Sequence, residues 1–302
     1  MKFLVTGGAG FIGSNLALRL AGEGHDVEVL DDLSLGTREN VSGIALSKGD
    51  ARDATLMDSL CREVGGVFHD AAKSSAPMFL PDPREGVDVN IRGFMNVLEA
   101  ARRRDFPVVY ATTSSLYSRC PPPHREDQDV VPGSFYEYSM YAREGAAALY
   151  SELYGLRTVG LRYFSVYGPR EGHKGKFANN ITQFLWDLMK GKSPVVFGDG
   201  SQTRDFTYVD DVVEANVLAM KSGLKGEVLN VGTGVSTSFN DMLAMLKSQL
   251  GSGVEPSYVQ NPLANYVRRT QADTTKARKL INFEAKVPLE EGIRRTVAFY
   301  RR

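Results

Sequence analysis

The stretch Thr6-Gly7-Gly8-Ala9-Gly10-Phe11-Ile12-Gly13-Ser14 follows a short apolar run and precedes an amphipathic segment, residues 11–22. Three glycines in it have the spacing G-x-x-G-x-x-G. A tight strand-to-helix turn needs glycine torsions, and a phosphate reaches the backbone closely only where a side chain is missing. The first amide groups of the helix then face the phosphates. The stretch therefore predicts a dinucleotide-binding turn, with cofactor contacts from Gly7, Gly10, Phe11, Ile12 and Gly13.

A carboxylate follows the next apolar run in the sequence. Val27–Leu30 ends at Asp31, about 20 residues after the glycines, as the dinucleotide fingerprint requires. A carboxylate at this point can accept hydrogen bonds from both ribose hydroxyls and would repel a 2′-phosphate. We therefore expect NAD rather than NADP, bound by Asp31 and Asp32, although Arg38 lies close enough to weaken that preference.

Short apolar runs alternate with helical stretches through the first half of the chain. Such alternation predicts an α/β protein in which helices cover both faces of a parallel sheet. We expect helices near 11–22, 53–63, 88–104 and 140–154. The expected strands are Phe3–Thr6, Val27–Leu30, Gly66–Phe68, Pro107–Ala111, Thr158–Arg162, Phe206–Val209 and Val228–Val231.

The pattern indicates a Rossmann doubly wound sheet with a smaller C-terminal substrate domain. We assign residues 1–165 and about 206–232 to the Rossmann domain. Residues of about 166–205 and 233–302 are less regular and richer in Gly, Pro and polar side chains, so we assign them to the substrate domain.

The composition narrows the class of partner. Lys plus Arg number 36 and Asp plus Glu number 36, so no net field attracts nucleic acid or an anionic membrane. The sequence has two cysteines, Cys61 and Cys120, and no apolar run of the ~20 residues that a membrane span needs. We expect a cytoplasmic protein without a nucleic-acid partner, a membrane partner or a metal site.

The sequence resembles the extended short-chain dehydrogenases, specifically the NAD-dependent nucleotide-sugar epimerases and dehydratases. The resemblance covers nearly the whole chain. It implies NAD as the cofactor, with Asp50 and Ala51 flanking the adenine and Ala71, Ala72 and Lys73 lining the nicotinamide side. Its anchors occur in family order at Thr6–Ser14, Asp50-Ala51, His69–Ala72, Ala111–Tyr117, Leu161–Arg170, Gly198–Asp210 and Gln271–Lys276.

The family chemistry implied by this resemblance is transient oxidation of the sugar. A Tyr phenolate takes a proton from a sugar hydroxyl while NAD takes the hydride, and the keto sugar is then reduced again. Because a free phenol has a pKa of ~10, it needs help as a base at neutral pH. A Ser or Thr and a Lys four residues after the Tyr give that help. Tyr136 and Thr113 match the first two positions.

The lysine position is occupied by Met140, which can supply neither charge nor a hydrogen bond to the ribose. No other register of the Tyr motif restores the lysine. Four explanations of Met140 remain open: another cation replaces the lysine, the enzyme is slow, the chain no longer catalyses, or the residue has been substituted. Arg143 is a candidate cation, although an Arg on a helix is more commonly a solvated surface charge.

A second acid or base is available in the stretch 167–175, which is similar to the matching loop of ADP-glycero-manno-heptose 6-epimerases. There the lysine at the position of Lys174 acts on the sugar. Lys174 is thus a candidate for catalysis or for a phosphate contact.

For the substrate, the resemblance implies contacts from Ser114, Ser115, Ser165, Asn180, Val196, Phe197 and Arg204.

The family comparison leaves several functions open. Dehydratases and decarboxylases carry an acid in the segment 113–115, whereas Ser114 and Ser115 are not acids, which favours an epimerase. We expect an epimerase of the UDP-glucose/galactose 4-epimerase type. A heptose 6-epimerase, a dehydratase and an NAD-binding protein with lost catalysis remain alternatives. The usual C-terminal nucleotide contact is replaced by Asn261–Arg269, so the identity of the nucleotide stays open.

Because family helices matching 88–104 and 140–154 pair across a two-fold axis, we also expect a homodimer.

Overall fold

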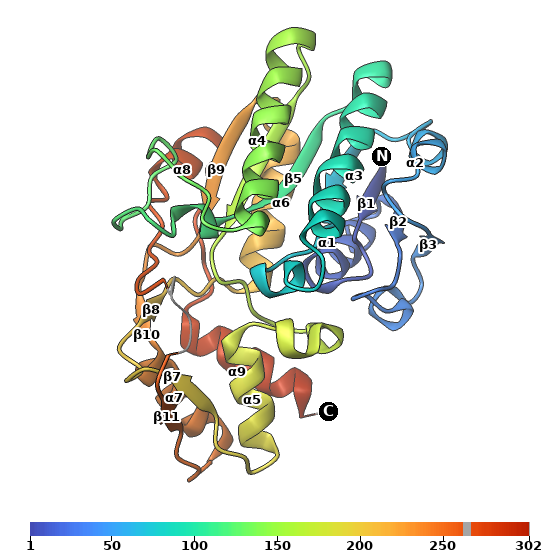
Figure 1. Ribbon diagram of the computed structural model, residues 1–302. Helices are drawn as coiled ribbons and strands as arrows, with labels where there is room; N and C mark the ends of the chain where they lie inside the picture. The colour runs from blue at the N-terminus through green and yellow to red at the C-terminus, as the bar shows by residue number, and fades with distance from the viewer. Residues whose placement is uncertain (262–266, 302) are drawn as a thin grey trace.

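The computed structural model describes residues 1–261 and 267–301 and has a parallel sheet at its centre (Figure 1). Within these residues seven strands form that sheet, in the order β3-β2-β1-β4-β5-β6-β9. This architecture confirms the predicted doubly wound α/β fold. The strands are β1 (Lys2–Thr6), β2 (Asp26–Asp31), β3 (Ala45–Lys48), β4 (Gly66–His69), β5 (Val108–Thr113), β6 (Thr158–Tyr163) and β9 (Glu227–Val231).

Helices cover both faces of the sheet. On one face α1 (Phe11–Gly22) packs beside α6 (Val209–Lys221). On the other, α2 (Ala54–Leu60) packs against α3 (Pro83–Arg104), which lies along α4 (Phe135–Tyr154) (Figure 1). Each layer has its own apolar core against the strands. No helix in the described ranges is long and apolar enough to cross a membrane.

A second group of smaller elements lies below the sheet in Figure 1. Two small sheets belong to it, an antiparallel β8–β10 pair and a parallel β7–β11 pair. Its elements are α5 (Asn180–Met189), β7 (Val195–Phe197), β8 (Thr203–Arg204), β10 (Thr237–Ser238), α7 (Phe239–Leu250), β11 (Ser257–Val259) and α9 (Leu289–Tyr300).

The remaining described elements join these two groups. Helix α8 (Thr275–Ile281) packs on β9 and α6, although it falls in the segment that we assigned to the substrate domain. The domain boundaries therefore stay a proposal. Four short 3₁₀ helices lie in the connections: η1 (Arg38–Val41), η2 (Ala76–Phe79), η3 (Ser114–Tyr117) and η4 (Gly172–Phe177).

One predicted strand is wrong, and one strand of the sheet was missed. Phe206–Val209 is not a strand of the sheet, because Val209 already begins α6 with Asp210 and Asp211 in its first turn. Two carboxylates there stabilise the positive end of the helix dipole, and this signal outweighs the alternating apolar pattern before it. Strand β3 was not predicted, since its sequence Ala-Leu-Ser-Lys is a partly exposed edge without a clear apolar run.

Helix α4 begins earlier than the predicted residue 140, and this places the candidate base on it. The Ser134 hydroxyl caps the helix by accepting a hydrogen bond from the Glu137 amide at 3.2 Å. Ser at the N-cap followed three residues later by Glu is a helix-start signal. Tyr136 consequently lies in the first turn, next to the end of β5 where Thr113 stands.

Candidate active site

One cavity of about 430 Å³ collects most of the predicted site residues at the carboxyl ends of the strands. In an open α/β sheet this is the edge where ligands bind. The predicted residues that line it are Gly7, Gly10, Phe11, Ile12, Gly13, Asp31, Asp32, Asp50, Ala51, Ala71, Ala72, Lys73, Thr113, Ser114, Ser115, Tyr136, Met140, Ser165 and Lys174.

The glycine turn packs so closely against neighbouring backbone that Gly7 and Gly13 cannot carry a side chain. Gly7 has a φ of +69°, and a Cβ on it would lie 2.6 Å from the Ala71 nitrogen. A Cβ on Gly13 would lie 2.5 Å from the Gly7 carbonyl oxygen. Gly10 caps α1 without a side-chain hydrogen bond, so the first amides of the helix face the cavity uncovered. These features fit the phosphates of a dinucleotide.

Asp31 lies at the end of β2 with its carboxylate held in place. Oδ2 accepts a hydrogen bond from the Ala9 amide at 2.9 Å, and Oδ1 accepts one from the Leu33 amide at 2.8 Å. Burial raises the pKa of the carboxyl, and these two hydrogen bonds oppose the rise. Because a carboxylate accepts about four hydrogen bonds, both oxygens retain capacity for ribose hydroxyls.

Replacing Asp31 by Ala is expected to weaken NAD binding by about tenfold or more, since a hydrogen bond to a charged group contributes about 1.5–3 kcal/mol. The preference for NAD over NADP should also fall, because the carboxylate that would repel a 2′-phosphate is gone. Calorimetric titration with both cofactors measures this. Asp26→Ala, at the exposed start of the same strand, is the control. Unchanged NAD affinity of Asp31→Ala would contradict the role.

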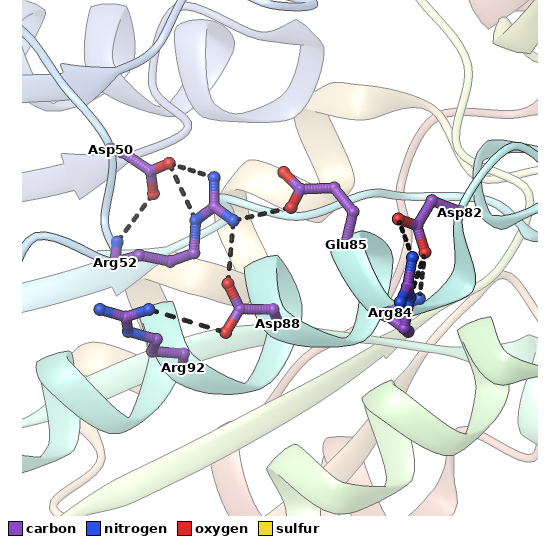
Figure 2. Close-up of polar contacts among 7 residues, drawn as sticks. All are labelled: Asp50, Arg52, Asp82, Arg84, Glu85, Asp88 and Arg92. Carbon is purple, nitrogen blue, oxygen red and sulfur yellow. Dashed lines mark hydrogen bonds and ion pairs between the residues drawn. The ribbon is translucent and has the colours of Figure 1, made fainter.

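The adenine end is supported by a network of charges (Figure 2). The Arg52 guanidinium contacts Asp50 at 2.6 Å, Asp88 at 2.9 Å and Glu85 at 3.0 Å, and so ties the loop after β3 to helix α3. Asn96 on the same helix donates to the Ala51 carbonyl at 2.9 Å. This arrangement positions the loop that was predicted to flank adenine.

The wall predicted for the nicotinamide is held by Asn90 of α3. Its Oδ1 accepts from the Lys73 amide at 2.8 Å, and its Nδ2 donates to the Lys73 carbonyl at 3.2 Å. The same Nδ2 lies 2.9 Å from the Ser139 hydroxyl. A single buried side chain thus fixes the loop after β4 relative to helix α4.

Tyr136 and Thr113 meet at the centre of the cavity. Burial raises the pKa of the Tyr136 phenol; a hydrogen bond to the Thr113 side chain and the charge of Arg143 lower it, and Glu137 raises it. Met140 is buried with Tyr136 and Phe79 in one apolar cluster. The lysine position therefore contributes a thioether beside the phenol and no charge.

Lys174 lines the opposite wall, in η4. Its Nζ lies 3.4 Å from Oε1 of the buried Glu171 and 5.6 Å from the centre of the Phe11 ring. Burial raises the pKa of the Glu171 carboxyl, and the Lys174 charge lowers it. The position near Phe11 is the start of α1, where a phosphate would lie.

A model of the NAD-dependent epimerase/dehydratase family matches residues 3–232. The chain belongs to this family. A UDP-glucose 4-epimerase of Mycolicibacterium smegmatis is 39% identical over 100% of this chain and 99% of its own. A Thermotoga maritima UDP-glucose 4-epimerase with UDP-glucose has a TM-score of 0.95 at 34% identity. A Thermus thermophilus UDP-glucose 4-epimerase in complex with NAD has a TM-score of 0.91 at 34% identity. Both cover 100% of this chain and 99% of their own.

This epimerase/dehydratase family member uses NAD, and the predicted nucleotide-sugar epimerase is confirmed. Some predicted substrate contacts lie outside the cavity: Asn180, Val196, Phe197 and Arg204 do not line it. Asn179, one residue earlier, does. Val196 is buried in β7, and the Arg204 guanidinium lies over the Phe239 ring. In the segment Asn261–Arg269, residues 262–266 lie outside the described residues.

Proposed function

We propose that this family member interconverts the two C4 configurations of a UDP-linked sugar. Three observations support the proposal. The relatives and structures compared above are named UDP-glucose 4-epimerases, Ser114 and Ser115 bring hydroxyls rather than acids to the reacting end of the cavity, and Tyr136 lies beside Thr113 there. The last observation carries the most weight, because base and orienting hydroxyl must contact the same sugar oxygen.

In this mechanism Tyr136 removes the proton of the C4 hydroxyl as the C4 hydride leaves, and Thr113 orients the sugar oxygen. NAD, when bound at the glycine turn, would supply the hydride acceptor for the oxidation and the hydride donor for the reduction. The keto sugar presents its other face before C4 is reduced, and Tyr136 gives the proton back. Asp31 would hold the adenine ribose of NAD, and the turn at Gly7–Gly13 would hold its pyrophosphate. The Glu137 carboxylate, on the residue after Tyr136, accepts a hydrogen bond from the Gly133 amide at 2.5 Å.

The proposal is tested by incubating the purified protein and NAD with UDP-glucose, UDP-galactose, UDP-N-acetylglucosamine and an ADP-heptose, and reading the products by NMR. We expect C4 epimers of at least one UDP-sugar and no 4-keto-6-deoxy product. Inversion of the ADP-heptose alone would favour the 6-epimerase, for which the position of Lys174 in the cavity is the supporting observation. A deoxy product would favour a dehydratase. NAD binding without turnover of any sugar would indicate lost catalysis.

We also propose a homodimer through helices α3 and α4, which lie side by side (Figure 1). A groove along them is lined by Pro83, Arg84, Val87, Asp88, Ile91, Arg92, Met95, Phe135 and Tyr138. Further along α4, the side chains of Tyr141, Leu149, Leu153 and Tyr154 are exposed. A contiguous apolar face of this kind marks an interaction site.

The dimer predicts twice the monomer mass in light scattering at micromolar concentration. Tyr138→Arg is expected to yield the monomer, because its side chain is 53% exposed in the groove and a charge there would be buried unpaired on association. Val235→Arg, at a position that is 62% exposed in the C-terminal half of the chain, should leave the mass unchanged. A monomeric parent protein would refute the assembly.

The free thiols of Cys61 and Cys120 support the proposed cytoplasmic location.

A further inference from the structure

Helix α4 carries a fully buried arginine one turn beyond Met140. Arg143 is 0% exposed and is the largest completely buried side chain in the described residues. Of the two interpretations given for Arg143, this excludes the solvated surface charge and leaves the candidate cation. Arginine is rarely buried without a carboxylate partner, because removing its charge from water is costly. Because burying this charge costs free energy, we expect the Arg143 guanidinium to act on a neighbouring group.

Backbone carbonyl oxygens, rather than carboxylates, hold the guanidinium. Nε donates to the Asn90 carbonyl at 2.8 Å, Nη2 to the Ala71 carbonyl at 2.7 Å and Nη1 to the Ala111 carbonyl at 3.4 Å. No ion pair involving Arg143 occurs in residues 1–261 and 267–301. These carbonyls are neutral, so they fix the orientation of the guanidinium and leave its charge uncancelled.

The three carbonyls also define where the charge lies. Ala71 and Ala111 both line the cavity, and Ala111 stands two residues before Thr113 on β5. The guanidinium is therefore directly behind the wall predicted for the nicotinamide and near the phenol of Tyr136. Burial lowers the pKa of Arg143 to about 10, which leaves the side chain charged at neutral pH.

We propose that Arg143 supplies the positive charge that the lysine supplies elsewhere in the family, by stabilising the Tyr136 phenolate from behind the cavity wall. Arg143 is a positioning residue, since it acts through Tyr136 and through the loop at Ala71. The inference rests on the proposed role of Tyr136 as the base. It also explains how Met140 is tolerated: the charge has moved one helical turn, from the cavity surface into the protein.

Other charged groups around the phenol do not replace this charge. On α4 itself, Glu137 opposes it. The loop after β4 brings Asp70 and Lys73 to the cavity, but the cation whose charge lowers the pKa of the phenol is Arg143. Burial raises the pKa of Asp70 to about 7, and the Arg143 charge lowers it, so Asp70 partly neutralises Arg143 as the pH rises past that value. Across the cavity the Lys174 ammonium is paired with Glu171.

Two variants distinguish the effect of the Arg143 charge from the effect of its hydrogen bonds. Arg143→Gln keeps donors for the carbonyls and removes the charge, whereas Arg143→Lys keeps the charge with fewer donors. The pKa of Tyr136 is measured by NMR on protein labelled with [¹³Cζ]tyrosine, with NAD bound and without sugar, and the signal is assigned with Tyr136→Phe. This readout requires no turnover, so it stays informative if the proposed substrate is wrong.

We expect Arg143→Gln to raise the pKa of Tyr136 and Arg143→Lys to stay near the parent. In turnover, Arg143→Gln should lower kcat about ten- to hundred-fold at pH 7, and the loss should shrink only as the pH approaches the pKa of the parent phenol. KM for the sugar should change little. Equal loss of kcat at every pH, with an unchanged Tyr136 pKa, would mean that Arg143 is only a structural clamp and would overturn the proposal.

A second variant keeps the test decisive if Arg143→Gln does not fold. Met140→Lys in the parent background should lower the Tyr136 pKa only slightly, because a cation is already present. A large fall in the pKa together with a large rise in neutral-pH turnover would overturn the proposal by showing that no cation acts there. Where Arg143→Gln folds, Met140→Lys added to it should restore the Tyr136 pKa and most of kcat.

Discussion

Tyr136→Phe is expected to reduce turnover at least about a hundredfold while NAD still binds. The phenol is the acid–base group in the described part of the cavity that contacts both Thr113 and the predicted nicotinamide side, and a positioned base contributes about 10²–10⁴-fold. The ring itself packs against Phe79, with centroids 5.9 Å apart, so Phe fills the same space. Initial rates and calorimetric NAD binding on the same preparation measure the two effects.

Tyr138→Phe is the matched control. It removes one hydroxyl two residues away, from a side chain that is exposed on the other side of the helix, and should leave kcat unchanged. An active Tyr136→Phe enzyme would mean that Tyr136 is not the base and that the register of the Tyr motif is wrong. The parent enzyme should itself be faster at alkaline pH: burial raises the pKa of the phenol, so the phenolate fraction grows as the pH approaches that value.

Arg162→Met is expected to destabilise the fold by about 3–5 kcal/mol, because it leaves a buried carboxylate unpaired. Arg162 on β6 donates to Glu144 of α4 through Nε at 3.0 Å and Nη2 at 2.6 Å, and to the Tyr117 hydroxyl at 2.7 Å. Both charged side chains are almost fully buried. Thr112 adds a 2.7 Å hydrogen bond to the same carboxylate. Urea unfolding followed by circular dichroism measures the loss.

The exposed pair on the same stretch of chain provides the control. Arg157, just before β6, contacts Asp105 at 3.3 Å, and the two side chains are 36% and 88% exposed. Exposed pairs contribute about 0–1 kcal/mol, so Arg157→Met should change the free energy of unfolding little. Equal stability losses in the two variants would contradict the assignment of Arg162–Glu144 as a buried anchor of α4.

Sequence patterns predicted the sheet well where the strands are buried. Strand β1 is buried from Phe3 to Thr6 and reads as a short apolar run, whereas the partly exposed edge strand β3 does not. The N-cap residues indicate where helices α3 and α4 begin more accurately than the amphipathic pattern does. Ser134 and Asp82 cap α4 and α3, yet periodicity alone placed both starts about five residues late.

The residues predicted to bind the cofactor line the cavity, because one local motif and its flanking strand fix the position of most of them. The substrate half depends on how distant segments fold together. A one-residue difference brings Asn179 rather than Asn180 to the cavity, since Asn179 caps α5 and accepts from the Ile181 amide at 3.0 Å. Arg143 could not be recognised as buried, because its partners are backbone carbonyls, which carry no signal in the sequence.

The position of β9 in the sheet has a consequence for how the chain emerges from the ribosome. Strand β6 ends at Tyr163 and its outer partner β9 begins at Glu227, so residues 164–226 are made between them. At about 5–20 residues per second this takes roughly 3–13 s. Throughout that interval β6 presents an unpaired apolar edge, which can template aggregation. Nascent chains stalled before Glu227 should therefore be the form of this protein that chaperones bind most strongly.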